Sequence, residues 1–238
     1  MNVVFLGPAG SGKSTLVKSM LNFLLEREYD VKAINLDPAS PPNYPCRDIR
    51  DFVRTEEIMA KEKLGINGAL LRSMELVKEV VDEVLERRDF VLIDTPGQME
   101  LFIYLSSGIE IAKKIAEKDW SVCVFVVDSA VASTPENFVS VLAQNAVVSL
   151  RMDMPVITVF NKSDVCRVPF SVKDIRKVRE ELRKREGVLA ELMEGLVDFL
   201  EVTTANYRII EVSALKGYGL EDVFDAVNEA FCSCGDFS

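Results

Sequence analysis

Histidine is absent from the 238-residue sequence. The most common general base and the most common zinc ligand are therefore missing, and so is every Ser-His-Asp or Cys-His nucleophile. Cysteine is scarce, with five scattered residues: Cys46, Cys123, Cys166, Cys232 and Cys234. An odd number at low density excludes a disulfide scaffold and is typical of a reduced, cytoplasmic chain.

Long hydrophobic runs are also missing. The longest purely apolar run, Val122 to Val127, is far shorter than the roughly 20 residues of a membrane-spanning helix. The N-terminus begins with a strand-like run that lacks a basic flank, so we expect no signal peptide. Basic residues are fewer than acidic ones: 28 Lys and Arg and 38 Asp and Glu give a net charge of −10. Nucleic acid and anionic membranes are therefore disfavoured as partners.

The residues that are present suit a globular protein with a sizeable core, since 48% are hydrophobic and 28% charged. Short apolar runs alternate with longer segments of helical periodicity. Because the runs are continuously apolar, they predict strands of a parallel sheet that is covered on both faces. The predicted strands are Val3–Leu6, Val31–Asn35, Phe90–Ile93, Val122–Val127, Val156–Phe160 and Ile209–Val212. The predicted helices are Thr15–Glu28, Leu70–Arg87, Glu136–Leu150 and Val172–Arg185.

This alternation predicts an α/β fold of three layers, doubly wound around a mainly parallel sheet. We expect one domain over residues 1–238, with helical insertions at about 38–89 and 165–208, where the connections are longer than a crossover needs. The first insertion is expected to hold two helices that are split near Gly65–Gly68. The proline-rich stretch Pro38–Pro45 cannot be helical and predicts an exposed loop.

A phosphate-loop pattern, G-x-x-x-x-G-K-[ST], occurs at Gly7 to Ser14. It follows the first predicted strand and precedes the first predicted helix. That context suits phosphate, because glycines let backbone N–H groups face its oxygens and a helix N-terminus favours negative charge. Lys13 would bridge the β- and γ-phosphates, and the Ser14 hydroxyl would ligate Mg²⁺. The candidate phosphate-binding residues of this loop are Gly10, Ser11, Gly12, Lys13, Ser14 and Thr15.

The motif D-T-P-G follows the third predicted strand, at residues 94–97. The pattern alone is common, and its position at the carboxyl end of a buried strand gives it weight, because such sheets bind ligands there. Asp94 would hold the water shell of Mg²⁺, and the Gly97 amide would contact the γ-phosphate. Gln98 comes next and would orient an attacking water; the alternative is a solvated loop residue.

Asp37 ends the second predicted strand. In many doubly wound folds that strand neighbours the phosphate loop, so Asp37 would face Mg²⁺ or the attacking water. The alternative is a turn cap before Pro38. The candidate metal ligands are therefore Ser14, Asp37 and Asp94.

The motif N-K-S-D at residues 161–164 follows the fifth predicted strand. Asp164 would accept hydrogen bonds from the N1–H and exocyclic amine of guanine, a donor pair that adenine does not present. Lys162 would lay its aliphatic stem against the base, and Asn161 would tie this loop to the phosphate site. After the last predicted strand, Ser213 and Ala214 would offer a backbone N–H to guanine O6.

These segments together resemble the GPN-loop GTPases of archaeal and eukaryotic type. The resemblance is carried by G-P-A-G-S-G-K-S-T at 7–15, N-L-D-P-A at 35–39, D-T-P-G-Q at 94–98, N-K-S-D at 161–164 and S-A at 213–214. It implies a P-loop NTPase fold and a homodimer in which the Gly-Pro-Asn loop of each subunit reaches into the nucleotide site of the other. There the Asn acts near the γ-phosphate in place of an arginine finger.

The matching loop here reads G-I-N-G at residues 65–68, so Ile66 stands in place of the proline. Proline would fix φ and stiffen the loop. Its replacement predicts a looser loop or an apolar contact across the dimer. Asn67 offers a donor and an acceptor together and joins Asp37, Asp94 and Gln98 as a candidate catalytic residue. The alternative is a helix-ending turn with Asn67 in a left-handed conformation.

Two other clusters receive no site role. Arg47, Arg50 and Arg54 are interpreted as solvated charge or pairing between subunits rather than as phosphate contacts. Cys232 and Cys234 lack a second pair or a histidine to complete a metal site.

We therefore expect a slow, Mg²⁺-dependent GTPase that acts as a homodimeric nucleotide switch on GTP and GDP. The first alternative is a nucleotide-gated assembly factor or scaffold, whose binding of protein partners in a larger complex is the function; the resemblance favours it, because eukaryotic members are linked to RNA polymerase assembly. A metal-delivery GTPase is disfavoured by the absence of histidine and of clustered cysteines, and a kinase by the combination of N-K-S-D with D-T-P-G-Q.

Overall fold

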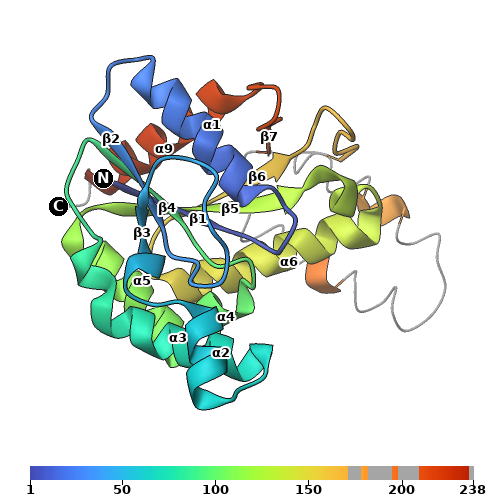
Figure 1. The fold of residues 1–238 in the computed structure, drawn as a ribbon. Coiled ribbons are helices and arrows are strands. Elements are labelled where there is room, and N and C mark those ends of the chain that lie inside the picture. Colours follow the sequence, from blue (N-terminus) through green and yellow to red (C-terminus); the bar gives the residue numbers. More distant parts are fainter. Residues whose placement is uncertain (171–177, 182–194, 198–208, 236–238) are drawn as a thin grey trace.

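A seven-stranded parallel sheet forms the centre of the molecule (Figure 1). The computed structural model describes residues 1–170, 178–181, 195–197 and 209–235, and the strand count refers to these. The strand order is β3-β2-β4-β1-β5-β6-β7. The strands are β1 (Asn2–Leu6), β2 (Val31–Asn35), β3 (Arg47–Asp48), β4 (Phe90–Asp94), β5 (Ser121–Asp128), β6 (Val156–Asn161) and β7 (Ile210–Glu211). The doubly wound α/β fold predicted from the sequence is thus confirmed.

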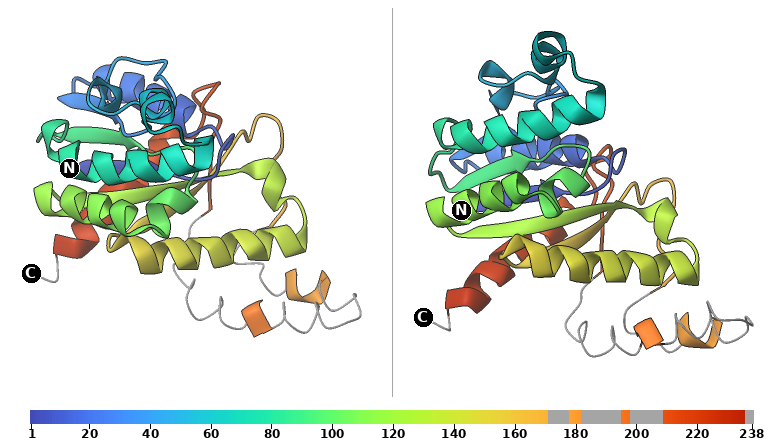
Figure 2. Two further views of the ribbon diagram at one scale, coloured as in Figure 1. Left: turned by 60° about the horizontal axis from the view of Figure 1, so that its bottom comes forward. Right: turned by 90° about the horizontal axis from the view of Figure 1, so that it is seen from below.

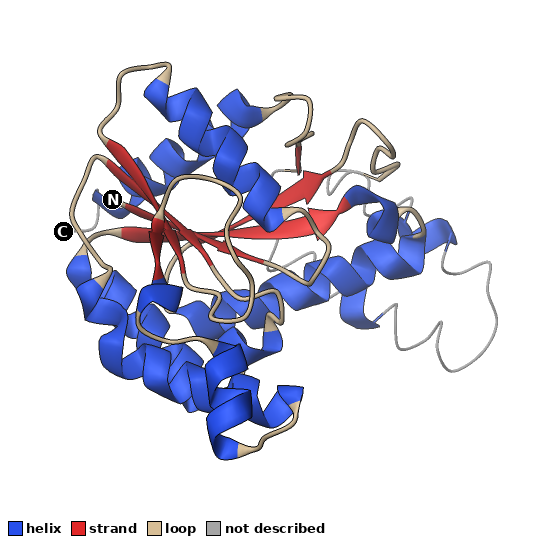
Figure 3. Ribbon diagram, in the orientation of Figure 1, coloured by secondary structure: helices blue, strands red, loops and turns tan. Residues whose placement is uncertain are grey.

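Helices cover both faces of this sheet (Figures 2 and 3). On one face lie α1 (Lys13–Leu25) and α9 (Leu220–Gly235). On the other lie α3 (Ile66–Val80), α5 (Ser106–Lys118) and α6 (Pro135–Met152). The short helices are α2 (Thr55–Glu62), which packs on α3, α4 (Glu100–Ile103), and the 3-10 turns η1 (Ile49–Asp51), η2 (Val81–Glu83) and η3 (Ser129–Ala132).

The alternation of side chains along β1 shows why the sheet needs both layers. Val3 and Phe5 pack into the core beneath α1 and α9, whereas Val4 and Leu6 pack into the core beneath the other layer. All four side chains are at most 2% exposed. A strand buried on both faces has no solvent-facing positions to fill with polar residues, which explains the continuously apolar run Val3–Leu6.

The structure corrects some predicted boundaries. Helix α3 begins at Ile66, four residues before the predicted start at Leu70, and ends at Val80. Strand β3 was not predicted, because two charged residues show no apolar pattern. The stretch Pro38–Pro45 holds no helix or strand, as predicted, yet it is not uniformly exposed, since Pro38 and Tyr44 are buried. Of the predicted helix at 172–185, only residues 178–181 are described, and they are helical.

No helix among the described residues is long and apolar enough to cross a membrane.

The loops that follow β1, β2, β4, β6 and β7 all leave the sheet at its carboxyl edge, because the strands are parallel. The polar motifs of the sequence lie on these loops, so the topology gathers them along one edge.

Candidate functional site: a pocket at the carboxyl edge of the sheet

The loop between β1 and α1 is held close to its neighbours by glycines. Gly12 precedes α1 with φ of +88°, a left-handed conformation that favours glycine. A Cβ atom there would overlap the side-chain amide of Asn161. A Cβ atom on Gly7 would likewise overlap the carbonyl oxygen of Val126 in β5. Space therefore demands glycine at both positions, and the backbone conformation demands it at Gly12 as well.

Lys13, the first residue of α1, is only 6% exposed at the bottom of this loop. Burial lowers the pKa of its ammonium group, and the nearby carboxylates of Asp94 and Asp37 partly restore it. The amine therefore lies in a site that gains from further negative charge, such as phosphate oxygens.

Asp94, at the end of β4, is 3% exposed. The hydroxyl of Tyr44 donates a 2.8 Å hydrogen bond to its Oδ2, while its buried Oδ1 has no hydrogen-bond partner among the described residues. Burial raises the pKa of this carboxyl group, and the hydroxyls of Ser14 and Tyr44 and the ammonium of Lys13 oppose that rise. An unpaired buried carboxylate oxygen is costly unless a ligand or water completes it.

The carboxylate of Asp37 has two roles in the structure. Its Oδ1 accepts hydrogen bonds from the backbone amides of Ala39, at 2.9 Å, and Ser40, at 3.3 Å, which is the turn-capping alternative. Its Oδ2 accepts a 3.4 Å hydrogen bond from the Gly97 amide across the pocket. The cap thus fixes a carboxylate that also faces the site.

Asn161, at the end of β6, connects three loops of the site. Its Nδ2 donates to the carbonyl of Ser11 at 2.9 Å, and its Oδ1 accepts from the Ala214 amide at 3.0 Å. The hydroxyl of Ser129 in turn donates to its backbone carbonyl at 2.8 Å. The phosphate-loop motif, N-K-S-D and S-A are therefore held in one cluster.

Two adjoining cavities run along this cluster. The larger, about 490 Å³, is lined by the glycine-rich loop and by Asp37, Asp94 and Gly97, among others. The smaller, about 210 Å³, is lined by Asn161, Asp164 and Ala214, among others. Gly12, Thr15 and Lys162 line both. The arrangement suits a ligand with an anionic part in the larger cavity and a flat polar part in the smaller.

Two predicted catalytic residues do not line these cavities. Gln98 is exposed, and its carbonyl accepts a 3.0 Å hydrogen bond from the Leu101 amide. Asn67 is exposed in the first turn of α3. The left-handed residue at the end of α2 is Lys63, with φ of +54°, so the helix-ending alternative for Asn67 is wrong.

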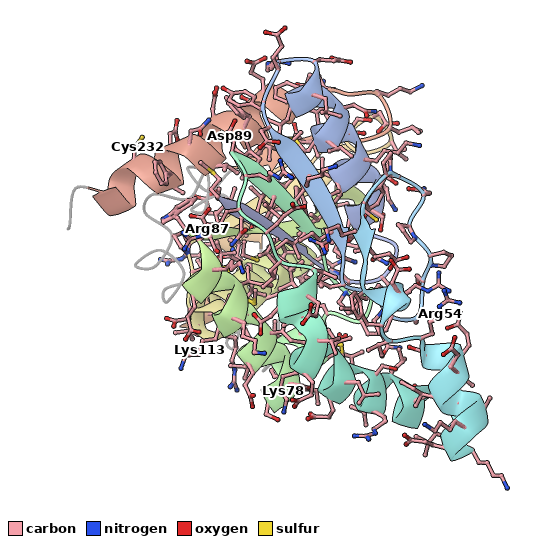
Figure 4. The ribbon with its side chains drawn as sticks, turned by 60° about the vertical axis from the view of Figure 1, so that its left-hand side comes forward. Arg54, Lys78, Arg87, Asp89, Lys113 and Cys232 are labelled. Carbon is pink, nitrogen blue, oxygen red and sulfur yellow. The ribbon has the colours of Figure 1, made fainter. Side chains whose placement is uncertain are left out.

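The charged and cysteine clusters stay outside the site. Arg47 donates to the carbonyl of Glu83, and Arg50 pairs with Glu56 at 3.0 Å. Arg54, labelled in Figure 4, precedes α2. Cys232 is exposed on α9, at the upper left of the same view, whereas Arg54 lies at the right. The side chain of Cys234 is not among those that the structure describes.

The contributors to the site that the sequence analysis missed include Tyr44, Asn35 and Asp128. The Nδ2 of Asn35 donates to Asp48 at 2.9 Å and to the carbonyls of Asp37 and Ser40 at 3.2 Å, which holds the loop together. Asp128 pairs with Lys162 at 2.7 Å. Both residues lie at strand ends, so the rule that singled out Asp94 was available for them. No sequence pattern marks Tyr44.

A divalent ion here would need ligands from outside the protein. Within the described part of the chain, no group of three or more Cys, Asp or Glu side chains could hold a metal. Mg²⁺ takes one or two protein ligands together with phosphate oxygens and water in such sites. The unpartnered Oδ1 of Asp94, with the Ser14 hydroxyl beside it, fits that role.

A glycine-rich loop between the first strand and helix of this sheet, with aspartates at the neighbouring strand ends, defines a P-loop nucleotide-binding protein. Residues 5–233 match a family model described as "Conserved hypothetical ATP binding protein". A GPN-loop GTPase of Pyrococcus abyssi is 31% identical over 257 aligned positions, which cover 100% of both chains. The chain belongs to the GPN-loop GTPase family.

Further comparisons agree with that membership. The crystal structure of a Pyrococcus abyssi GTPase in apo form superposes with a TM-score of 0.84 at 28% identity, covering 98% of each chain. GPN-loop GTPase 1 of Dictyostelium discoideum is 31% identical over 242 positions, covering 97% of this chain and 61% of the relative. The chain thus spans about three fifths of the length of that relative, and 62% of the length of GPN-loop GTPase QQT2 of Arabidopsis thaliana.

Proposed function

We propose that the protein binds GTP and hydrolyses it to GDP and phosphate. The observation that carries the proposal is the double hydrogen bond of Asn161, to Ser11 and from Ala214. It holds the N-K-S-D loop against the phosphate loop, so that a base beside Asp164 and phosphates beside Lys13 belong to one ligand. Guanine is selected because the Asp164 carboxylate accepts from its N1–H and amine, which adenine does not match.

The phosphates are bound by charge and by backbone amides. Lys13 and the N–H groups of Gly10 to Ser14 surround the β- and γ-phosphates. Ser14 and Asp94 would hold Mg²⁺, which supplies charge neutralisation between the phosphates when bound. Bound Mg²⁺ with its water would give the Oδ1 atom of Asp94 a partner. The phosphates would place negative charge beside the buried ammonium group of Lys13.

Hydrolysis then requires an oriented water and stabilisation of the γ-phosphate charge. Asp37 already lines the larger cavity and is the candidate within one subunit. Asn67 and Ile66 are exposed, Ile66 by 51%, at the start of α3. We therefore assign Asn67 to the site of a second copy, with Ile66 as an apolar contact in a homodimer. Without a histidine no stronger base exists, and we expect slow turnover.

Nucleotide preference tests the proposal. Binding of fluorescent GTP, ATP and xanthosine triphosphate is measured for the wild type and for Asp164→Asn. The wild type should prefer GTP over ATP by at least about a hundredfold, because mismatched buried polar groups are costly. The variant should bind GTP more weakly and xanthosine triphosphate more tightly, because the C2 carbonyl of xanthine accepts a hydrogen bond from the new amide. Equal binding of ATP and GTP by the wild type would overturn the choice of guanine.

One observation favours a second function, the nucleotide-gated binding of a protein partner. The segment after Gln98 forms one wall of an apolar groove of about 170 Å³, with Met99, Ile103 and Tyr104 facing Val147 of α6. Because Gln98 directly follows the proposed γ-phosphate contact at Gly97, the groove is placed to respond to the nucleotide. Amide exchange of residues 99–104 should then differ between the GTP and GDP states; identical exchange contradicts this second function.

A further inference from the structure

Tyr44 contacts the site although it belongs to none of the nucleotide-binding motifs. It lies in the proline-rich loop between β2 and β3, where its ring packs at 7% exposure into the core beneath α1 and α9. Its hydroxyl reaches Asp94 Oδ2 at 2.8 Å, a contact between residues 50 positions apart. We propose, on the basis of the GTPase function above, that Tyr44 is a positioning residue that orients the Asp94 carboxylate toward Mg²⁺.

The argument begins with the two oxygens of Asp94. Oδ2 is taken by Tyr44, and Oδ1 is buried without a hydrogen-bond partner among the described residues. A carboxylate rotates about its Cβ–Cγ bond unless a partner fixes it, and a hydrogen bond to a charged group is among the stronger ones. With Oδ2 fixed, the same oxygen always remains for the metal and its water shell.

The hydroxyl is a dependable donor. The ordinary pKa of a phenol is about 10, so its hydroxyl carries a proton near neutral pH. A protonated phenol beside a carboxylate can serve only as the donor. The direction of the hydrogen bond, and with it the orientation of Asp94, is therefore fixed.

The loop that carries Tyr44 is itself anchored. Asn35 donates from Nδ2 to the carbonyls of Asp37 and Ser40 and to the Asp48 carboxylate, on both sides of Tyr44 in the sequence. The Tyr44 hydroxyl is thus supported by a braced loop rather than by a free segment. Asp37, which is proposed to contact the attacking water, lies on the same loop and lines the larger cavity. This loop therefore positions Asp37 directly and the metal ligand Asp94 through Tyr44.

Tyr44→Phe tests the proposal, because it keeps the buried ring and removes only the hydroxyl. The measured quantity is the Mg²⁺ concentration that half-maximally slows release of fluorescent GDP, together with release in EDTA. We expect that concentration to rise about five- to tenfold, about 1.0 to 1.4 kcal/mol of metal binding, while release in EDTA is unchanged. Single-turnover hydrolysis should show the same Mg²⁺ shift at saturating GTP.

Tyr29→Phe is the matched control. Tyr29 packs its ring against Phe90 at 5.1 Å, before β2 at the amino edge of the sheet, and its change should leave the Mg²⁺ titration unaltered. An unaltered titration in Tyr44→Phe overturns the proposal, and so does equal weakening with and without Mg²⁺, which marks a purely structural role. If the wild type binds no guanine nucleotide, the GTPase function itself fails, before any variant is compared.

Discussion

The Gly97 amide donates its hydrogen bond to the Oδ2 of Asp37, 3.4 Å away across the pocket. In the proposed mechanism the same amide donates to the γ-phosphate. Carboxylate and phosphate therefore compete for one donor, and a bound γ-phosphate frees Asp37 to face the attacking water. In this proposal, one exchange of hydrogen-bond acceptor at the Gly97 amide links nucleotide binding to the release of the Asp37 carboxylate.

This competition predicts opposite effects of one substitution on binding and on chemistry. Asp37→Ala removes the competing carboxylate and its repulsion of phosphate, so GTP affinity should hold or rise. Single-turnover hydrolysis should fall by about tenfold or more, about 1.4 kcal/mol in the barrier. Asp37→Asn is the control for the turn, because its Oδ1 still accepts from Ala39 and Ser40. Equal rates in Asp37→Ala and wild type would remove Asp37 from the reaction.

The role of Asn67 in a second subunit predicts complementation. Asn67→Ala should slow hydrolysis by about tenfold, about 1.4 kcal/mol, at unchanged GTP affinity. Lys13→Ala should abolish GTP binding. A mixture of the two should regain activity, because a mixed dimer joins an intact Lys13 with an intact Asn67 from the other subunit. Asn137→Ala, which changes an exposed Asn in the first turn of α6, should have no effect. Absence of recovery in mixtures that form dimers contradicts the trans role.

The clamp by Asn161 predicts a joint loss of stability and affinity. Asn161→Ala removes the hydrogen bond donated to the Ser11 carbonyl and the one accepted from the Ala214 amide. It should lower the free energy of unfolding in urea by about 2 to 4 kcal/mol and weaken the binding of both GTP and GDP. Asn145→Ala is matched in chemistry, since Asn145 is buried and its Nδ2 donates to Thr158 Oγ1 at 2.7 Å, outside both cavities. It should lower stability and spare affinity. Wild-type affinity in Asn161→Ala would refute the clamp.

Cysteine reactivity gives a test that depends on pH. Burial, followed by the charge of Asp48, raises the pKa of Cys46 to about 11. Its thiolate fraction, and hence its alkylation rate, should rise about tenfold per pH unit between pH 7 and 9. At pH 7 the exposed Cys232 should be modified well before Cys46, as read by mass spectrometry of the peptides. Equal rates at pH 7 would show that the Cys46 thiol is not shielded as described.

The sequence predicted those parts of the site that depend on one segment each. The phosphate loop and the motifs after β4 and β6 are local patterns at strand ends, and the parallel sheet gathers them by topology alone. Tyr44 was not predicted because its role depends on a hydrogen bond to Asp94, 50 residues away, and no sequence periodicity indicates such a contact. The start of α3 at Ile66 was missed for a similar reason. Gly65 and Gly68 resemble a helix break, while packing on α2 and α5 overrides their low helical propensity.

The position of β1 has a consequence for how the chain folds. Although it is first in the sequence, β1 lies between β4 and β5 in the sheet, so Asn2 lies beside Val91 and Ser121. During synthesis at about 5 to 20 residues per second, its apolar residues wait on the order of ten seconds for their neighbours to emerge. Pairing between strands that are distant in sequence slows folding, and until it forms the apolar strand stays exposed and prone to aggregation. The nascent chain therefore keeps an apolar strand unpaired for longer than a fold whose paired strands are consecutive in sequence.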